Sequence, residues 1–204
     1  MTLKSQQSAY FEHISVPSDQ SFLWRMDDYP WRRNVWNYHP EIEIHLIRKS
    51  SGLCYIGDYI GNFEPGHLIM IGSNLPHNWI TLPADGTLIK DRDIVVQFDP
   101  RSFIKVGRLI PELSELRLLF DNASVGLEFF GDDAKACRVI LEEMEHQGGL
   151  RRIVLMLKLL AVMAAAKDIR PLATQRYTSV ERAWRTSDLK RLERALNYMQ
   201  EQYL

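Results

Sequence analysis

Short segments of alternating apolar and polar residues, separated by turn residues, fill most of the chain between residues 9 and 98. The clearest is residues 41–49, where three apolar side chains alternate with three polar ones: Ile42, Ile44 and Leu46 with Glu41, Glu43 and His45. This period is that of a β-strand, in which successive side chains point to opposite faces. Turn sequences interrupt the segments, among them Gly-Asp at 57–58 and Pro-Gly at 65–66. Many short strands with frequent turns predict a closed barrel or a double sheet.

The chain changes to a helical pattern after residue 99, with one further short strand expected at residues 126–131. Residues 132–147 carry a single apolar stripe, whereas residues 150–167 are apolar on almost every side. A helix without a polar face needs cover on more than one side. We expect one side to lie on the barrel or the preceding helix and the other on a second subunit. The expected interface residues are Leu150, Ile153, Val154, Leu157, Leu160 and Met163. The predicted fold class is mostly β with C-terminal helices.

Composition limits the classes of function. The 204 residues are enough for one core domain with an appendage, and the net charge of -1 gives no global basic field for nucleic acid. Cys54 and Cys137 each lie in an apolar pattern, which favours buried free thiols in a reducing compartment. The start of the sequence lacks the apolar run of a signal peptide. The longest apolar stretch, residues 153–166, is shorter than the roughly 20 residues that cross a bilayer. We therefore expect a cytoplasmic protein with no membrane partner.

Polar side chains stand on one face of the strand at 41–49. By parity His39 and Glu43 share that face, and His77 comes from a segment that can lie beside it. If the face is the barrel interior, these groups must hydrogen-bond to one another, to a ligand or to a metal. Two imidazoles and a carboxylate suit a divalent transition metal. They suit a hydroxyl-rich ligand such as a sugar equally well, by accepting and donating hydrogen bonds. The pattern requires no cofactor, and both interpretations stay open.

Large aromatic residues accompany the polar cluster. Trp24, Trp36 and Trp79 can stack on a flat ligand, although a large aromatic side chain in a small barrel is more often part of the core. We expect His45 and His67 at the rim or on the outer face of the barrel.

The same residues resemble the metal motifs of the cupin fold. Asn37, His39 and Glu43 fall at the two histidine places and the glutamate place of its first motif, and Pro-Gly at 65–66 with His77 match its second. The resemblance implies a cupin-like double-stranded β-helix, a jelly-roll barrel, with Asn37 in its binding site. Because Asn37 replaces a histidine, the match disfavours metal chemistry.

Nearly the whole chain resembles the N-terminal sensor domain of the AraC family of bacterial transcription regulators. The stretches that carry this resemblance are Tyr-His-Pro-Glu-Ile-Glu at 38–43, Phe-Glu-Pro-Gly at 63–66, Leu-Pro-His-Asn-Trp at 75–79, Gly-Leu-Glu-Phe at 126–129 and Arg-Leu-Glu-Arg-Ala-Leu-Asn-Tyr-Met at 191–199. The family usually has Asp where this chain has His67.

The resemblance implies a division of the chain into four parts. Residues 1–131 are expected to form a ligand-binding barrel with an N-terminal arm, and residues 132–167 a helical dimerisation hairpin. Residues 168–186 are expected to be a linker. Residues 187–204, with an apolar stripe at three- and four-residue steps, would be the first helix of a DNA-binding domain whose helix-turn-helix motifs lie beyond Leu204.

Two functions from different classes follow. The first is an effector-sensing and dimerisation module that binds a small molecule in the barrel, forms a homodimer and contacts DNA only through the absent domain. The second is a metal-dependent cupin enzyme, an isomerase or a dioxygenase, with His39, Glu43 and His77 as metal ligands. Asn37 and the long helical extension disfavour the enzyme.

Overall fold

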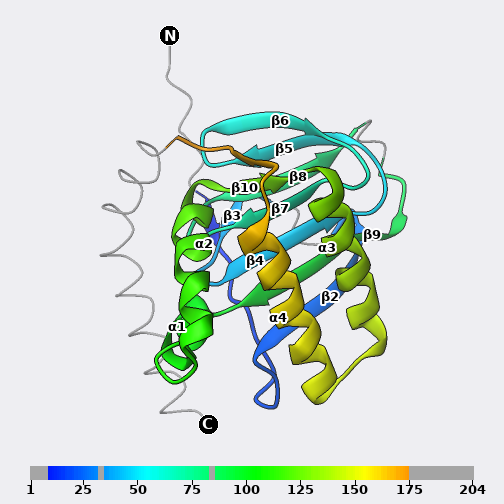
Figure 1. Ribbon diagram of the computed structural model, residues 1–204. Coiled ribbons are helices and arrows are strands. Elements are labelled where there is room, and N and C mark those ends of the chain that lie inside the picture. The colour runs from blue at the N-terminus through cyan, green and yellow to red at the C-terminus, as the bar shows by residue number, and fades with distance from the viewer. Residues whose placement is uncertain (1–8, 32–34, 83–85, 175–204) are drawn as a thin grey trace, which may run out of the picture.

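The β region consists of two sheets that face each other (Figure 1). The structure is a computed structural model that describes residues 9–31, 35–82 and 86–174. The five-stranded sheet runs in the order β1 (Tyr10–Phe11), β3 (Asn37–Tyr38), β8 (His77–Thr81), β5 (Gly52–Ile56) and β6 (Tyr59–Phe63). The six-stranded sheet runs in the order β11 (Ile169–Pro171), β10 (Leu127–Phe129), β7 (Leu68–Ile71), β4 (Ile42–Ile47), β9 (Ile89–Phe98) and β2 (Phe22–Tyr29). The helices follow the main run of strands.

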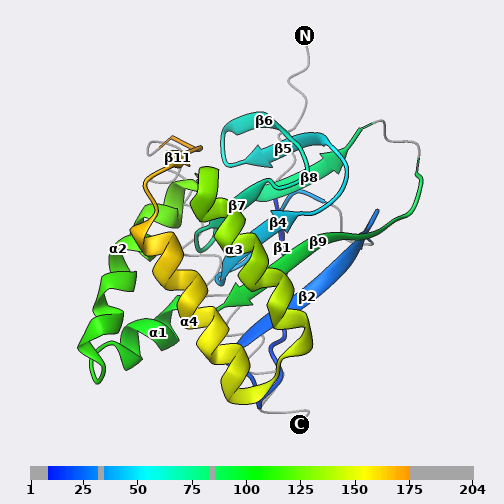
Figure 2. The same cartoon turned by 45° about the vertical axis from the view of Figure 1, so that its right-hand side comes forward.

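The helices cover the outer face of the six-stranded sheet (Figures 1 and 2). They are α1 (Pro100–Val106), α2 (Leu116–Asn122), α3 (Gly131–Glu143) and α4 (Gly149–Ala165), with short 3-10 turns η1 (Pro111–Glu115), η2 (Ala123–Val125) and η3 (Met144–His146). The predicted fold class, mostly β with C-terminal helices, is confirmed. Within the described residues, no helix is long and apolar enough to cross a membrane.

Strand β4 is buried on both of its faces. Ile42, Ile44 and Leu46 point outward and form core with the helices, while Glu43 and His45 point between the two sheets. The parity of the sequence pattern therefore placed Glu43 correctly on the face that points between the sheets. The strand has no solvated face, because helices cover one side of it and the second sheet covers the other.

Trp24 lies outside the barrel. It shares a face of β2 with the outward-facing residues, and its indole Nε1 donates a hydrogen bond to the backbone oxygen of Leu141 in α3 at 3.0 Å. The expectation that Trp24 contacts a ligand in the barrel is therefore wrong, because its ring packs beneath the helices.

Helix α4 turns only part of its predicted interface outward. Leu160 and Met163 are 0% exposed and pack in the hydrophobic core of the same chain. Their assignment to a subunit interface is therefore wrong. Ile153 and Leu157 are partly buried and pack against the same core. The remaining two residues of that prediction, Leu150 and Val154, are 78% and 56% exposed. An apolar helix can satisfy much of its need for cover by packing on a sheet and on a neighbouring helix.

The segment expected to be a linker, residues 168–186, begins with a strand. Ile169–Pro171 pairs antiparallel with β10 as β11, and the backbone N–H of Thr174 donates to the carboxylate of Asp58 at 2.8 Å. This part of the linker prediction is wrong, because β11 covers the edge that β10 would otherwise leave unpaired. The rest of the linker, the N-terminal arm at 1–8 and the expected helix at 187–204 lie outside the described residues.

Candidate functional site

The carboxylate of Glu43 is the centre of a buried polar network between the two sheets. Its Oε2 accepts a hydrogen bond from Nε2 of Gln97 at 2.7 Å and lies 3.2 Å from Nε2 of His39. Its Oε1 lies 2.8 Å from Nδ1 of His45 and 3.7 Å from Nε2 of His77. Strand pairing produces this arrangement, because Glu43 of β4 is directly opposite Gln97 of β9, while His77 comes from the facing sheet.

Backbone carbonyls fix the orientation of His39 and His77. Nδ1 of His39 lies 3.2 Å from the carbonyl oxygen of Glu41, and Nδ1 of His77 lies 2.8 Å from that of Leu75. A carbonyl only accepts, so each Nδ1 carries the proton and each Nε2 is directed at Glu43. Ligand atoms of His39, Glu43 and His77 all lie within 4.8 Å of one another. This set could hold a divalent transition metal, with each imidazole oriented by a carbonyl in the way that metal-binding histidines commonly are.

His45 belongs to the network, although the sequence suggested a rim or outer-face position. Its ring stacks on Trp79, with centroids 3.9 Å apart and planes 21° apart, and its Nε2 lies 3.6 Å from a carboxylate oxygen of Asp93. Parity already pointed this side chain to the same face as Glu43. The expectation was wrong because strand β4 stays covered over its whole length.

Burial and neighbouring charges separate the pKa values of the histidines. Burial alone would lower the pKa of His45, but Asp93 and Glu43 outweigh it and raise that pKa to about 9. Burial, together with the other histidines, lowers the pKa of His77 to about 4 despite the attraction of Glu43. The pKa of Glu43 itself is held well below its usual value, because its imidazole partners outweigh its burial. Near neutral pH the site therefore contains a carboxylate, a charged His45 and a neutral His77.

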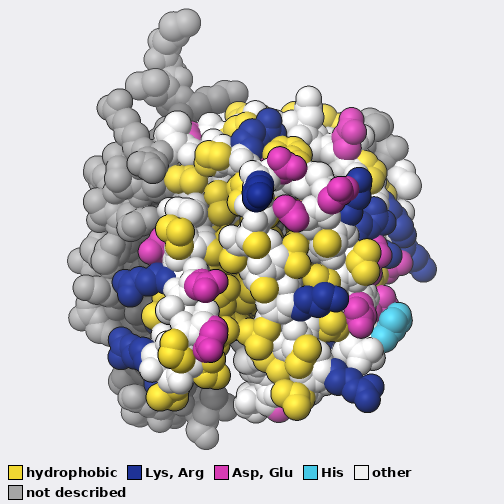
Figure 3. Space-filling view, in the orientation of Figure 1, with side chains coloured by type: hydrophobic (Ala, Val, Ile, Leu, Met, Phe, Trp, Pro, Cys, Tyr) yellow, Lys and Arg dark blue, Asp and Glu magenta, His cyan; other side chains and the backbone are white. Residues whose placement is uncertain are grey.

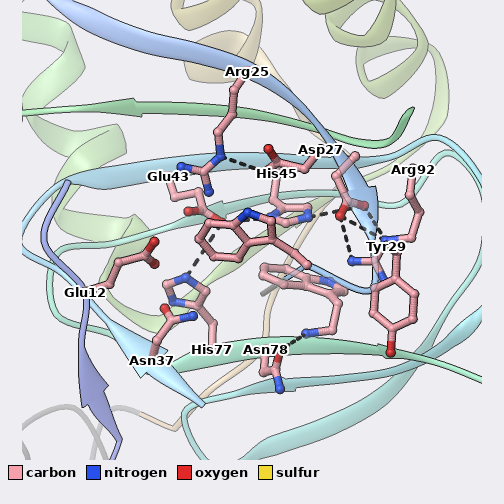
Figure 4. A pocket seen from close by; sticks show the side chains of 13 residues that line it. Glu12, Arg25, Asp27, Tyr29, Asn37, Glu43, His45, His77, Asn78 and Arg92 are labelled. Carbon is pink, nitrogen blue, oxygen red and sulfur yellow. Dashed lines mark hydrogen bonds and ion pairs between the residues drawn. The ribbon is translucent and has the colours of Figure 1, made fainter. Parts of the chain in front are cut away.

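A small cavity of about 50 Å³ adjoins the network (Figure 4). Besides Glu43, His45 and His77, its lining includes Glu12, Arg25, Asp27, Tyr29, Trp31, Asn37, Asn78, Trp79, Arg92 and Asp93. Figure 4 shows Glu12 and Asn37 on one side of the cavity and Tyr29 and Arg92 on the other, with Glu43 and His45 between the sheets. Both acidic and basic groups therefore face the same small space.

The two arginines of the cavity are held by neighbouring side chains. Arg25 donates to Asp27 at 2.6 Å and to Gln97 at 2.9 Å. Arg92 donates to Asp93 at 2.7 Å and lies over the ring of Tyr29, with its guanidinium carbon 4.1 Å from the ring centroid. These contacts fix both cations in place, so the cavity wall is preorganised.

Three lining residues present buried polar atoms that have no hydrogen-bond partner among the described residues. They are the indole Nε1 of Trp79, a donor, Oδ1 of Asn37, an acceptor, and Nε2 of His45, which lies 3.6 Å from a carboxylate oxygen of Asp93. Such atoms are rare in native interiors because each costs roughly 1–3 kcal/mol when left unpaired. A bound molecule with a hydroxyl group can satisfy both kinds of atom.

The structure brings together most of the sequence-predicted site residues. His39, Glu43 and His77 meet in one cluster, and Asn37 and Trp79 line the adjoining cavity. Trp36 does not line it, and Trp24 lies under the helices.

Sequence reasoning missed the polar residues that β2 and β9 supply, notably Arg25, Asp27, Asp93 and Gln97. Each alternates with an apolar residue that faces the helices, so the same parity argument could have found all four.

His67 occupies a separate buried position at the edge of the six-stranded sheet. Its Nε2 lies 3.2 Å from Oε1 of Glu128, and the other carboxylate oxygen of Glu128, Oε2, accepts a hydrogen bond from Arg170 of β11 at 2.5 Å. The side chain of His67 is only 7% exposed, so the expectation of a rim or outer-face position is replaced by a buried ion-pair cluster. This cluster fastens β11 to β10 and lies outside the cavity.

Comparisons with known proteins find a distant structural similarity. No family model matches the chain, and no curated protein matches it. The chain is similar to ToxT from Vibrio cholerae O395, in a crystal structure with (E)-4-(8-methylnaphthalen-1-yl)but-3-enoic acid bound, with a TM-score of 0.39 and 13% sequence identity. The match covers 69% of this chain and 54% of the ToxT chain, so this chain corresponds to about half the length of ToxT.

Proposed function

We propose that the chain is the effector-binding and dimerisation module of a transcription regulator, as its resemblance to the AraC family implies. A small hydroxyl-rich molecule such as a sugar binds in the cavity between the sheets. Binding changes the arrangement of the barrel mouth and so alters how a DNA-binding domain outside this chain meets its site. This requires the ligand to bind one arrangement better than the other.

One observation carries the proposal of a ligand site. The cavity lies beside a preorganised network of fixed charges, yet its wall contains the unpaired donor of Trp79 and the unpaired acceptor of Asn37. A purely structural polar cluster would be expected to satisfy its buried atoms internally. Stacking on Trp79 would add apolar contact with the face of a sugar ring.

The test is a thermal-shift screen of sugars and other polyols, followed by affinity measurements on matched tryptophan variants. Trp79→Phe removes the unpaired donor but keeps an aromatic ring, and we expect it to weaken binding by about tenfold. Trp24→Phe makes the same change outside the barrel and should leave affinity unchanged. Equal loss of affinity in both variants, or the absence of any stabilising molecule, would contradict the proposal.

The regulatory step has its own test. In the regulator that includes the DNA-binding domain, saturating ligand should change the affinity for its DNA site. The same ligand concentration should have no such effect in Glu43→Gln, in which we expect the affinity of the cavity for the ligand to be lower. Unchanged DNA affinity in the presence of bound ligand would leave a binding protein without the regulatory role.

A metal site is the second candidate, and the orientation of two imidazoles favours it. Nε2 of His39 and Nε2 of His77 both point at Glu43, which gives two nitrogen ligands and one oxygen ligand. A divalent metal held there would act as a Lewis acid, as the cupin-enzyme alternative needs. Against it, Asn37 stands where a further histidine would complete the ligand set.

Metal analysis separates the two candidates. The metal interpretation predicts a stoichiometric transition metal in protein purified without chelator, and its loss in His77→Ala. A metal-free preparation that still binds a polyol supports the sensing module alone.

A further inference from the structure

Hydrogen-bond acceptors gather on one side of the cavity between the sheets. Figure 4 shows Glu12 and Asn37 there, next to His77. The amide nitrogen of Asn37 donates to the carbonyl oxygen of Val35 at 3.1 Å, so Oδ1 is the amide atom that is left buried without a partner among the described residues. This side of the cavity therefore offers carboxylate and amide oxygens to a bound molecule.

Strand pairing holds Glu12 on this side. Strand β1 runs parallel to β3, with Phe11 opposite Tyr38, and the backbone N–H of Glu12 donates to the carbonyl oxygen of Tyr38 at 2.9 Å. Glu12 is only 7% exposed, so its carboxylate lies inside the barrel wall. A carboxylate has about four lone-pair sites, so Glu12 can accept a hydrogen bond from a ligand in addition to its contacts within the protein.

The charges of the described lining favour a cation over an anion. Aspartates hold both of its arginines, at 2.6 Å for Arg25 and at 2.7 Å for Arg92, and Glu43 lies 2.8 Å from Nδ1 of His45. Glu12 adds a further carboxylate to this wall. An anionic ligand would meet cations that carboxylates already hold, whereas a cation complements the wall. Carboxylates on the helical face are scattered and solvated (Figure 3), so a cation gains little there.

The unpaired donor of Trp79 belongs to the same end of the cavity. Asn37 pairs with His77 across strands β3 and β8, and the ring centroid of His77 is 5.7 Å from that of Trp79. The cavity volume is about 50 Å³, and one water needs roughly 10–15 Å³ of such space, so only a few atoms at one end of a ligand enter it. That end must present an acceptor to Trp79 and donors to Asn37 and Glu12.

We propose that the ligand is an amino polyol, such as an amino sugar, which places a protonated amine against Glu12 and Oδ1 of Asn37 and an adjacent hydroxyl against Nε1 of Trp79. An ammonium group has three N–H donors and matches a wall of acceptors, while the hydroxyl oxygen accepts from the indole. Hydrogen bonds that involve a charged group are roughly twice as strong as neutral ones. This chemical class for the effector rests on the proposed effector-binding function.

Matched sugars test the need for an amine. The probes are glucosamine, galactosamine and mannosamine, each compared with its parent hexose and with its N-acetyl derivative. Titration calorimetry with chelator present, slightly below neutral pH, keeps the amines protonated and the site free of metal. At least one amino sugar should bind about tenfold or more tightly than both of its neutral counterparts. The N-acetyl derivative is the sharper control, because it keeps the nitrogen and removes the charge.

Two substitutions locate the amine within the cavity. Glu12→Gln keeps the size of the side chain and removes its charge, and we expect the preference for the amino sugar over the hexose to fall to about twofold or less. Asn37→Ala removes the unpaired acceptor at a half-buried position and should lower the same preference. Glu41→Gln is the matched control, because Glu41 lies 3.7 Å from His39 but does not line the cavity, and the preference should persist. Melting curves check that each variant folds.

The possible outcomes separate the amine from the sensing function. A hexose that binds as tightly as its amino sugar, or a preference that survives both Glu12→Gln and Asn37→Ala, would overturn the amine assignment and leave the polyol site in place. The same holds if a neutral polyol from the thermal-shift screen binds and none of the amino sugars does. If neither the amino sugars nor any other polyol binds, the proposed function fails together with the amine assignment.

Discussion

At the scale of single residues, Glu43 supplies the hydrogen-bond acceptor for the buried polar side chains inside the barrel. Its two carboxylate oxygens lie at hydrogen-bond distance from Gln97, His39 and His45. Glu43→Ala would leave these groups buried without their acceptor, and we expect the free energy of unfolding to fall by about 3 kcal/mol or more. Urea denaturation in the presence of a chelator measures it.

Glu41→Ala is the matched control for that substitution. The Glu41 side chain is 18% exposed and its carboxylate approaches His39 no closer than 3.7 Å. We expect a loss below about 1 kcal/mol. A loss as large as that of Glu43→Ala would mean that the network is not centred on Glu43.

His45 makes the free energy of unfolding depend on pH between neutral and alkaline values. Its pKa rises from 6.5 to about 9 on folding, so the folded state binds the proton more tightly than the unfolded chain does. The resulting stabilisation is fully present below pH 6.5 and is lost as the pH rises through 9. At about 1.4 kcal/mol for each pH unit, its upper limit is about 3 kcal/mol.

We therefore predict that the free energy of unfolding falls between pH 6.5 and 9, and that His45→Gln flattens most of this fall. Some slope should remain because the pKa of His39 is also raised. Chemical denaturation across the pH range, with chelator present, makes the comparison. A His45→Gln profile as steep as that of the unsubstituted chain would assign the effect to other groups.

Sequence parity identified part of the site at the residue scale and could have identified more. It placed His39 and Glu43 on one face, because alternation alone determines which face of a strand a residue occupies. His77 meets them from β8 of the facing sheet, and not from a strand beside β4 as the sequence suggested, because strand order is a property of the tertiary fold. Parity did not reveal that Trp24 packs under α3, since the identity of the covering element is a property of the tertiary fold. The hydrogen-bond partners of Glu43 likewise depend on strand register, which no local pattern specifies.

At the scale of elements, helix α4 shows that composition alone does not predict which face of a helix is buried. Its sequence is apolar nearly all round, yet Leu160 is fully buried in its own chain while Val154 is 56% exposed. Which side of such a helix meets the sheet depends on packing and cannot be deduced from hydrophobicity alone. The same limit explains why β11 was expected to be a linker: three residues with a proline carry little strand signal, and pairing with β10 supplies the rest.

This difference within α4 gives a prediction. Val154→Asp should leave the fold intact and, if the exposed face of α4 joins two subunits, shift the protein from dimer to monomer. Leu160→Asp should unfold the chain, with a loss of about 4 kcal/mol or more, because it buries an unpaired charge. Light scattering after gel filtration measures the mass, and melting curves measure the fold.

Val139→Asp on the exposed face of α3 is the control for a surface charge. A dimer that persists in Val154→Asp would exclude this face of α4 as the interface.

At the scale of the whole molecule, the cavity and the exposed face of α4 lie on opposite sides of one sheet. The network of Glu43 points between the sheets, while α4 packs on the outer face of the six-stranded sheet (Figures 1 and 2). Among the described residues no side chain belongs to both regions, so their energetics should be separable unless the barrel changes shape.

We therefore expect ligand stabilisation and dimer formation to respond to different substitutions. At a ligand concentration 100 times Kd, the free energy of unfolding should rise by about 2.7 kcal/mol. Val154→Asp should keep this gain, whereas Glu43→Gln should lose most of it and keep the oligomeric state. Melting curves with and without the best molecule from the screen, at two protein concentrations, measure both effects together. If Val154→Asp also removed the ligand response, the two faces would behave as one cooperative unit, and the ligand would act by changing the barrel and the helical face together.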